Sequence, residues 1–412
     1  MVDEALVSNK IQEYFSRLLA QSGIKICAIT ISKGVEKGKN IVGTIAKVEV
    51  QDSENENKFY YFIIKSAPRD LKFRKFIQSS ILFEREMYLY TKVLPEFDKF
   101  QQEINVTNPF QSYAKYFGAT VEELDEAIVM QDMVADGYKL LNSEKSLDYE
   151  HIVLVLKEYG KFHALSYALR ERKPQVFSEL ISNTVEDYFT GQAWNTLKLP
   201  IQMTLQKAIK TINSIEHEVL HKKMASFLNK VTETLKKVLK VETPTKYDVI
   251  GHGDCWINNI LFKYENIENP NFPTKICFID WQFSRVGSPA LDISYFLFTS
   301  TDTILRKKHY DNFIREYHNS LCSFYSKLTD KSEICLPYKV LQEHLRKFSI
   351  YGLLMSIQAL YLMLNKPKEE ESESDVTKVV DILAYESTNM HEYNIRIKDM
   401  ILDFDQLGYN FE

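Results

Sequence analysis

Residues 249–262 read VIGHGDCWINNILF, and residues 276–281 read ICFIDW. Asp254 precedes Asn259 by five positions, and Asp280 ends the second, strand-like run. If residues 260–264 and 276–279 pair as a hairpin, the ends of that hairpin meet, so Asn259 lies beside Asp280. The pattern therefore predicts an amide oxygen and a carboxylate side by side, with the carboxylate of Asp254 close to both.

Such a group of side chains suits phosphoryl transfer. Magnesium prefers oxygen ligands and keeps some of its coordination sites for phosphate and water. A further carboxylate must orient the attacking hydroxyl and accept its proton. An isolated Asp-x-x-x-x-Asn is more typical of a capped turn. The pair His252-Gly253 before Asp254, and the strand that ends in Asp280, favour the catalytic interpretation.

These segments resemble the catalytic and metal-binding segments of the protein-kinase-like superfamily, in its small-molecule branch with aminoglycoside phosphotransferases and choline kinases. Three stretches are more specifically similar to the ecdysteroid kinase-like family of insects: WINN at 256–259, KFHALS at 161–166 and GSPALD at 287–292. The resemblance runs from about Gly38 to the C-terminal helices. It implies that Asp254 is the catalytic base, that Asn259 and Asp280 bind Mg²⁺, and that ATP is the phosphate donor.

The front of the chain offers a matching lysine. Lys65 ends the apolar run FYYFII at 59–64, where the superfamily places the lysine that holds the α- and β-phosphates. Taken alone, a lysine that closes a strand is usually a solvated end. Its partner on the next helix is Glu84 or Glu86, and the family pattern favours Glu86.

Residues 38–44, GKNIVGT, resemble the loop that covers the phosphates. The resemblance implies nucleotide contacts at Gly38, Asn40 and Gly43, since glycine lets backbone N–H groups approach a phosphate. A plain hairpin turn would also use Gly and Asn. The family pattern has Ser where Gly43 stands, so only a backbone contact is implied there.

Residues 130–133, MQDM, resemble the link between the two lobes. The resemblance implies that adenine is held there by main-chain hydrogen bonds at Gln131 and Met133. Gln131 replaces an acidic residue that is common in the family, which matters little for contacts to the backbone. An ordinary strand end is the alternative interpretation.

The order of patterns predicts an α+β, two-lobed protein-kinase-like fold. Short β-branched and aromatic runs before residue 65 indicate an antiparallel sheet, and helical periodicity dominates from about residue 149. We expect a β-rich nucleotide-binding lobe with the hinge over 1–132, and a helical lobe with the catalytic loop and acceptor site over 133–412. A helix over 76–93 is expected to end at Pro95. Asp292 is expected to cap a helix or brace the catalytic loop, and His163 to pack in the core.

Composition and charge indicate which kinds of partner the protein is expected to bind. The chain has 412 residues, 45% hydrophobic and 26% charged, which is typical of a soluble globular protein, and its net charge of −5 argues against nucleic acid. Five cysteines without a C-x-x-C pair indicate reduced thiols. Charged residues interrupt both the N-terminus and the apolar stretch 340–364, so we expect a buried helix at 340–364 and no membrane partner. A cytoplasmic monomer is the expectation.

The sequence says least about the acceptor, the molecule that receives the phosphate. The family resemblance implies an ecdysteroid or another hydroxylated lipophilic alcohol. The aromatic residues Tyr188, Phe189 and Trp194, with Trp256 and Trp281 nearby, could wall an apolar pocket. Choline would call for an aromatic cage with acidic residues. A choline, ethanolamine or aminoglycoside kinase therefore stays an alternative, as does a nucleotide-binding pseudokinase, although the joint presence of Lys65 and the Asp254 group argues against the pseudokinase.

Overall fold

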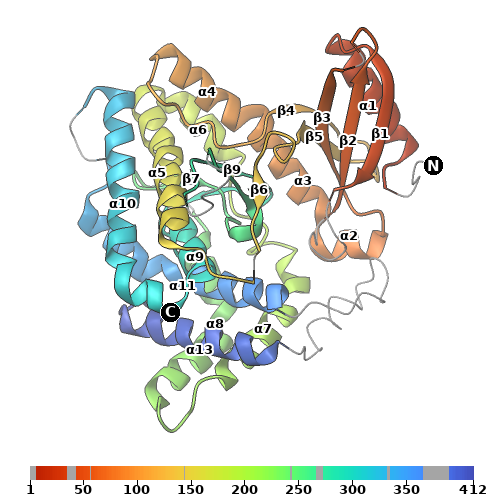
Figure 1. The fold of residues 1–412 in the computed structure, drawn as a ribbon. Coiled ribbons are helices and arrows are strands. Elements are labelled where there is room, and N and C mark those ends of the chain that lie inside the picture. Colours follow the sequence, from red (N-terminus) through yellow and green to blue (C-terminus); the bar gives the residue numbers. More distant parts are fainter. Residues whose placement is uncertain are drawn as a thin grey trace.

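A five-stranded antiparallel sheet forms the N-terminal part of the chain (Figure 1). The computed structural model describes residues 6–34, 43–55, 57–142, 144–241, 244–265, 272–331, 335–364 and 389–412. The strand order is β1-β2-β3-β5-β4. The bounds are β1 Ile26–Lys33, β2 Thr44–Asp52, β3 Phe59–Ser66, β4 Tyr116–Thr120 and β5 Ala127–Gln131.

The sheet has a small hydrophobic core of its own. Helix α1 (Asn9–Gln21) begins at Ser8, whose side chain accepts a hydrogen bond from Ile11 N–H, and it buries an apolar stripe against the sheet. Phe15 of α1 meets Phe62 of β3 edge to face, with ring centroids 5.3 Å apart. Because this core is separate from the main one, the sheet and α1 form an N-terminal lobe.

The helical segment after β3 differs from the single helix expected over 76–93. It is divided into α2 (Leu71–Ile77), α3 (Ser79–Tyr88), a π-helical turn η1 (Leu89–Val93) and α4 (Leu94–Glu103). The expectation that Pro95 ends the helix was wrong, because Pro95 lies in the first turn of α4, where its missing N–H costs no intrahelical bond. The buried residues of α3 and α4 join the core of the helical part.

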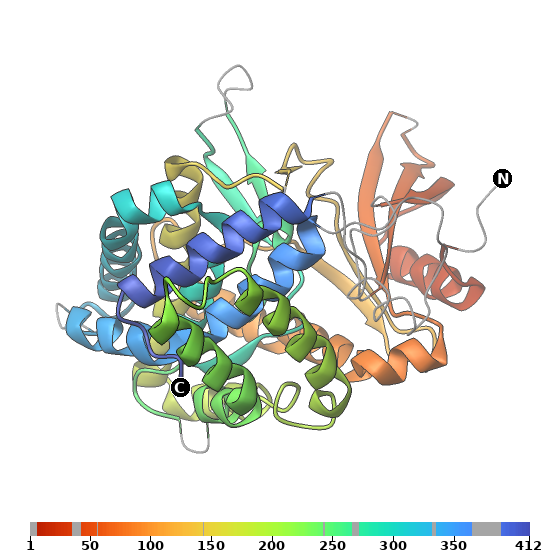
Figure 2. The same ribbon diagram turned by 90° about the horizontal axis from the view of Figure 1, so that it is seen from below.

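Helices make up the C-terminal lobe (Figure 2). Helix α5 lies against α10, and α9 lies against α11 and α5. By length and composition α11 could cross a membrane, but 78% of its most apolar window is buried inside the structure, as expected for residues 340–364. The bounds are α5 Tyr149–Arg172, α6 Pro174–Ser182, α7 Trp194–Lys210, α8 Glu218–Leu239, α9 Ala290–Ser300, α10 Thr303–Thr329, α11 Tyr338–Leu364 and α13 Met390–Gln406.

Short strands inside the helical lobe position the loops of interest. The predicted hairpin is confirmed: β8 (Ile260–Lys263) pairs antiparallel with β9 (Lys275–Phe278), with Ile260 opposite Phe278. Strand β6 (Lys139–Leu140) adds to the other edge of β8. Strand β7 (Val249–Gly251) pairs with β10 (Arg285–Gly287), so the segments that follow β9 and β7 lie together.

The predicted α+β, two-lobed architecture is confirmed. An antiparallel sheet with its own core precedes a larger helical part with a separate core. The exact division at residue 132 stays a prediction.

Candidate active site

Lys65 links the two lobes. It lies on the central strand β3, opposite Ile45 of β2 and Ile128 of β5, and its side chain is buried. Its Nζ is 2.5 Å from Glu86 Oε2 on α3 and 2.7 Å from Asp280 Oδ1, which follows β9. Glu84 is exposed on the same helix, so Glu86 is the glutamate that contacts Lys65.

The electrostatics of this group follow from burial and charge. Burial opposes the ammonium of Lys65, but the carboxylates of Asp280 and Glu86 together raise its pKa, so the lysine is charged at neutral pH. Burial raises the pKa of Glu86 to about 7 against the lowering effect of Lys65. Two carboxylates therefore share one ammonium, and a further positive charge at Asp280 would relieve the excess of negative charge.

Asp254 is held by two neutral donors. Tyr295 OH on α9 donates to Asp254 Oδ1 at 3.1 Å, and Asn259 Nδ2 donates to Asp254 Oδ2 at 3.1 Å. The same amide nitrogen also donates to the Asp254 carbonyl oxygen at 2.8 Å. Burial and then the nearby Asp280 carboxylate raise the pKa of Asp254 well above its usual range. The result is an oriented and unusually basic carboxylate.

Backbone conformation brings the two loops into contact. Gly253 has φ +83°, and a Cβ at this position would lie 1.9 Å from the carbonyl oxygen of Phe283, so a side chain here would be excluded on both grounds. Asp280 also has a positive φ of 67°, which turns its carboxylate toward Lys65 as β9 ends. A non-glycine residue in this region is uncommon and typical of functional sites.

A buried set of side chains supports the loop from below, and we call Asp292, His163 and Tyr317 the loop platform. Asp292 Oδ2 accepts His252 N–H at 2.8 Å, and its Oδ1 accepts Gly253 N–H at 2.9 Å. His163 Nε2 lies 3.2 Å from Asp292 Oδ2, while Nδ1 lies 2.8 Å from Tyr317 OH. Burial opposes ionisation of Asp292, but His163 and the loop donors lower its pKa. Asp292 therefore braces the loop at His252 and Gly253.

His252 serves structure and not acid–base chemistry. Burial lowers its pKa to about 4, so the ring is neutral at pH 7. Nε2 lies 3.1 Å from the Ile279 carbonyl oxygen, which can only accept, so Nε2 carries the proton. Nδ1 accepts the N–H of Asp254 at 3.3 Å. The ring packs on Trp281, which is fully buried beneath the loop and is therefore no wall of an open pocket.

A second buried pair lies on the other side of the loop. Arg285 Nη1 donates to the Phe283 carbonyl oxygen at 3.0 Å and is 3.6 Å from Glu186 Oε2. The guanidinium lies over the ring of Tyr351 at 4.4 Å, and Tyr351 OH donates to the Gly253 carbonyl oxygen at 3.0 Å. Arg285 Nε, Arg285 Nη2 and Glu186 Oε2 are buried and have no hydrogen-bond partner among the described residues.

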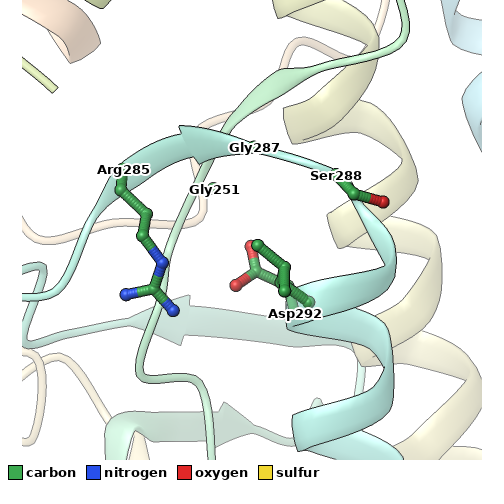
Figure 3. Close-up of a pocket in the computed structure, with 6 residues that line it drawn as sticks. Gly251, Arg285, Gly287, Ser288 and Asp292 are labelled. Carbon is green, nitrogen blue, oxygen red and sulfur yellow. The ribbon is translucent and has the colours of Figure 1, made fainter. Parts of the chain in front are cut away.

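Arg285 and Asp292 face the same small cavity from opposite sides (Figure 3). The arginine reaches it from β10 and the aspartate from α9, so the cavity separates the two buried polar groups. Its lining comprises Gly251, Arg285, Gly287, Ser288, Leu291 and Asp292.

The predicted nucleotide contacts fall into three groups. Gly38 and Asn40 lie outside the described residues. A Cβ on Gly43 would lie 2.5 Å from the Ser66 carbonyl oxygen, so strand packing alone already requires glycine there. Gln131 N–H is bonded to the Lys115 carbonyl and the Met133 carbonyl accepts from Tyr138 N–H. Within the described chain no backbone hydrogen bond from the Met133 N–H is found, and contacts of Gln131 and Met133 with adenine stay a prediction.

The oxygen donors suit Mg²⁺. Asn259 uses its amide nitrogen on Asp254, which leaves its side-chain oxygen for a cation, and Lys65 engages only one carboxylate oxygen of Asp280. Two protein oxygens with open positions for phosphate and water are the pattern that Mg²⁺ prefers. No group of three or more His, Cys, Asp or Glu side chains able to hold a metal lies in the described part of the chain.

Sequence reasoning missed Tyr295, Arg285, Glu186 and Tyr351. Tyr295 had a usable signal, since it follows Asp292 by three positions and so shares its face of a helix. Glu186 and Tyr351 lie far from Arg285 in sequence, and no local pattern joins them.

Comparison with known proteins gives one family and several distant structures. The ecdysteroid kinase-like family matches residues 37–329. Plasmodium vivax ethanolamine kinase is 14% identical with a TM-score of 0.42, and the match covers 90% of this chain and 81% of that one. A microcompartment-associated aminopropanol kinase is 12% identical with a TM-score of 0.42, covering 97% and 100%. A GDP and kanamycin complex of APH(2″)-IIia is 10% identical with a TM-score of 0.40, covering 90% and 97%.

No curated protein matches the chain. The family match nevertheless spans more than half of the sequence and contains Lys65, Glu86, Asp254, Asn259 and Asp280. The chain therefore belongs to the ecdysteroid kinase-like family.

Proposed function

We propose that this protein is an ATP- and Mg²⁺-dependent kinase that phosphorylates a hydroxyl of a lipophilic small molecule, such as an ecdysteroid. The observation that carries the proposal is the bridge from Lys65 Nζ to both Glu86 and Asp280. This bridge sets a phosphate-binding lysine beside a candidate metal ligand, although the two residues come from different lobes.

Each residue has a distinct role in this proposal. Asp254 accepts the proton of the acceptor hydroxyl, and its raised pKa makes it a stronger base. Tyr295 and Asn259 hold the two carboxylate oxygens so that the base keeps one orientation. Lys65 binds phosphate oxygens, and Asn259 and Asp280 hold the metal. Mg²⁺, when bound, supplies positive charge next to the transferring phosphate.

The charges beside Asp254 favour a neutral acceptor. Glu186 is buried, and the Arg285 guanidinium lies 3.6 Å from it, so its charge is already matched. A quaternary ammonium would need an aromatic cage with unmatched acidic groups. Tyr188 and Phe189 are buried, but the ring of Phe283, which packs on both, is partly exposed, and such apolar surface suits a lipophilic alcohol.

The test is ADP release with a panel of acceptors. We expect turnover with hydroxylated steroids, and none above background with choline, ethanolamine or kanamycin. Turnover with choline alone would refute the steroid-like acceptor and keep the kinase chemistry. The Asp254→Asn variant serves as the control for ATP hydrolysis that does not depend on the base.

A pseudokinase makes a different prediction. It would bind Mg·ATP, seen as a rise in melting temperature, but would release no ADP with any acceptor and would not respond to Asp254→Asn. We expect nucleotide binding and turnover together, with turnover lost and nucleotide binding weakened in Asp280→Asn.

A further inference from the structure

The chain between α6 and α7 contacts both the helix that carries Glu86 and the loop that carries Asp280. We call residues 184–189, which lie in this stretch, the connector. Buried and exposed residues alternate along the connector as far as Tyr188, so its two sides face different surroundings. A segment with two such sides can bind two neighbours at once.

One side of the connector holds α2 and α3. Arg85 of α3 donates from Nη2 to the Val185 carbonyl oxygen at 3.2 Å, and the same nitrogen donates to the carboxylate of Asp187. Tyr188 OH donates to the carbonyl oxygen of Ile77, the last residue of α2, at 2.8 Å. The two helices that follow the sheet are therefore bonded to a segment of the helical lobe.

The Arg85 contacts fix the orientation of α3. The side chain of Arg85 is only 5% exposed, whereas that of Asp187 is 62% exposed. A buried cation costs desolvation energy unless it is paired, so Asp187 and the Val185 carbonyl hold Arg85 in this place. Arg85 and Glu86 are consecutive on one helix, so their side chains point about 100° apart. An arginine fixed on the connector therefore also fixes the rotation of α3 that turns Glu86 toward Lys65.

The other side of the connector holds the loop that follows Asp280. The Thr184 carbonyl oxygen accepts the N–H of Val286 on β10 at 2.8 Å. The ring of Phe189 stacks on that of Phe283, with centroids 5.5 Å apart. The buried ion pair described above adds a third contact between the same two segments. The loop is therefore bonded or packed at both ends of the connector.

We propose that the connector positions the two carboxylates that bind Lys65, with Arg85 as the positioning residue on the side of Glu86. Lys65 Nζ contacts Glu86 and Asp280. The connector binds the residue before Glu86 and the loop after Asp280, so these contacts form a closed ring across the two lobes. The inference rests on the proposed function, in which Lys65 must be held in place to bind phosphate oxygens.

The first experiment measures amide hydrogen exchange in the full-length protein. Asp187→Ala removes the anion that Arg85 contacts, and the replaced residue is exposed, so the core stays intact. We expect exchange over residues 79–88 of α3 to become about fivefold faster, because one charged pair no longer holds the helix. Exchange in β1 and β2 should stay unchanged. Unaltered exchange over 79–88 would overturn the proposal.

The second experiment measures the Kd for Mg·ATP by calorimetry. Asp187→Ala should raise it by about fivefold, since Glu86 no longer holds Lys65 in one place. Asp187→Glu keeps the negative charge and should bind Mg·ATP as the wild type does. Asp405→Ala is the matched control: it removes the partner of Lys223 in an ion pair between α13 and α8, and it should not change the Kd.

A double-mutant cycle separates positioning from a general loss of stability. In Glu86→Gln the carboxylate that the connector positions is already gone, so adding Asp187→Ala should change the Kd for Mg·ATP by less than about twofold. A loss of about fivefold in both backgrounds, or no loss in Asp187→Ala alone, would overturn the proposal. A wild type that binds no Mg·ATP would instead refute the proposed function, and the inference that rests on it would fall as well.

Discussion

The loop platform and the Arg285–Glu186 pair are both buried next to the loop of Asp254, yet they are built differently. In the platform, both oxygens of Asp292 and both ring nitrogens of His163 have partners, and the His163–Asp292 contact is 3.2 Å. In the pair, Arg285 and Glu186 approach only to 3.6 Å, and three of their polar atoms have no hydrogen-bond partner among the described residues.

The loop platform is the more rigid of the two regions, and the Arg285–Glu186 pair is the less constrained. A fully satisfied polar network strengthens itself in a low-dielectric interior and specifies one arrangement. A buried ion pair with unmatched donors costs desolvation energy that its Coulomb attraction only partly returns. Residues that break this rule tend to be retained for a site's function. We infer that the platform fixes the loop, whereas the Arg285–Glu186 pair is held less tightly.

The largest effect should come from Asp254, which follows Gly253, the residue bonded to both Asp292 and Tyr351. Asp254→Asn keeps the size of the side chain and one acceptor oxygen for Tyr295 or Asn259, but removes the proton acceptor. We expect kcat to fall by about 10²–10⁴. Binding of Mg·ATP, measured by calorimetry, should change little, whereas Asp280→Asn should weaken it. Near-normal turnover in Asp254→Asn would show that another residue is the base.

Asp292→Asn tests the platform. The amide supplies one acceptor oxygen where the carboxylate supplied two, so a loop N–H loses its partner in the interior. We expect the free energy of unfolding in urea to fall by about 3 kcal/mol, with a parallel loss of kcat. Glu84→Gln, which removes an exposed carboxylate on α3, is the matched control and should change neither quantity. A loss below about 1 kcal/mol would mean that the loop does not depend on Asp292.

Arg285→Met tests the pair. It leaves the Glu186 carboxylate buried without its cation, which should cost about 3 kcal/mol of stability. Adding Glu186→Gln should recover most of that loss, because replacing both members of a buried pair is often near neutral. In the platform, adding His163→Phe to Asp292→Asn should recover nothing, since the loop amides still lack an acceptor. If both double variants recovered the same share of the lost unfolding free energy in urea, the platform and the pair would not differ as inferred.

The smallest effect should come from Tyr295→Phe, which removes one hydrogen bond to Asp254 and keeps the ring. Such a bond to a charged group is worth about 1.5 kcal/mol, so we expect kcat to fall by about tenfold with KM for ATP unchanged. Tyr393→Phe is the control, since this buried hydroxyl on α13 has no partner among the described residues. A Tyr295→Phe protein with full kcat would show that Asn259 alone orients the base.

Local patterns predicted much of this molecule. The hairpin of β8 and β9 followed from two strand-like runs on either side of a proline-containing stretch, and hairpin geometry alone set Asn259 near Asp280. The apolar residues of α11 indicated a buried helix correctly. Pro95 was expected to end the helix over 76–93, but it lies in the first turn of α4. A proline after a helical pattern can mark either the end of one helix or the start of the next, so the residue alone does not distinguish the two.

By itself the sequence determined the order of the elements, the two-lobed class and the residues that form the Lys65 and Asp254 groups, since periodicity and motif spacing are local properties. Only the tertiary structure decided that Glu86 contacts Lys65, that Tyr295 holds Asp254, and that Arg285 pairs with Glu186. Those choices depend on which side chains meet across two lobes and several helices. Contacts between residues distant in sequence arise from packing, and no local pattern encodes them.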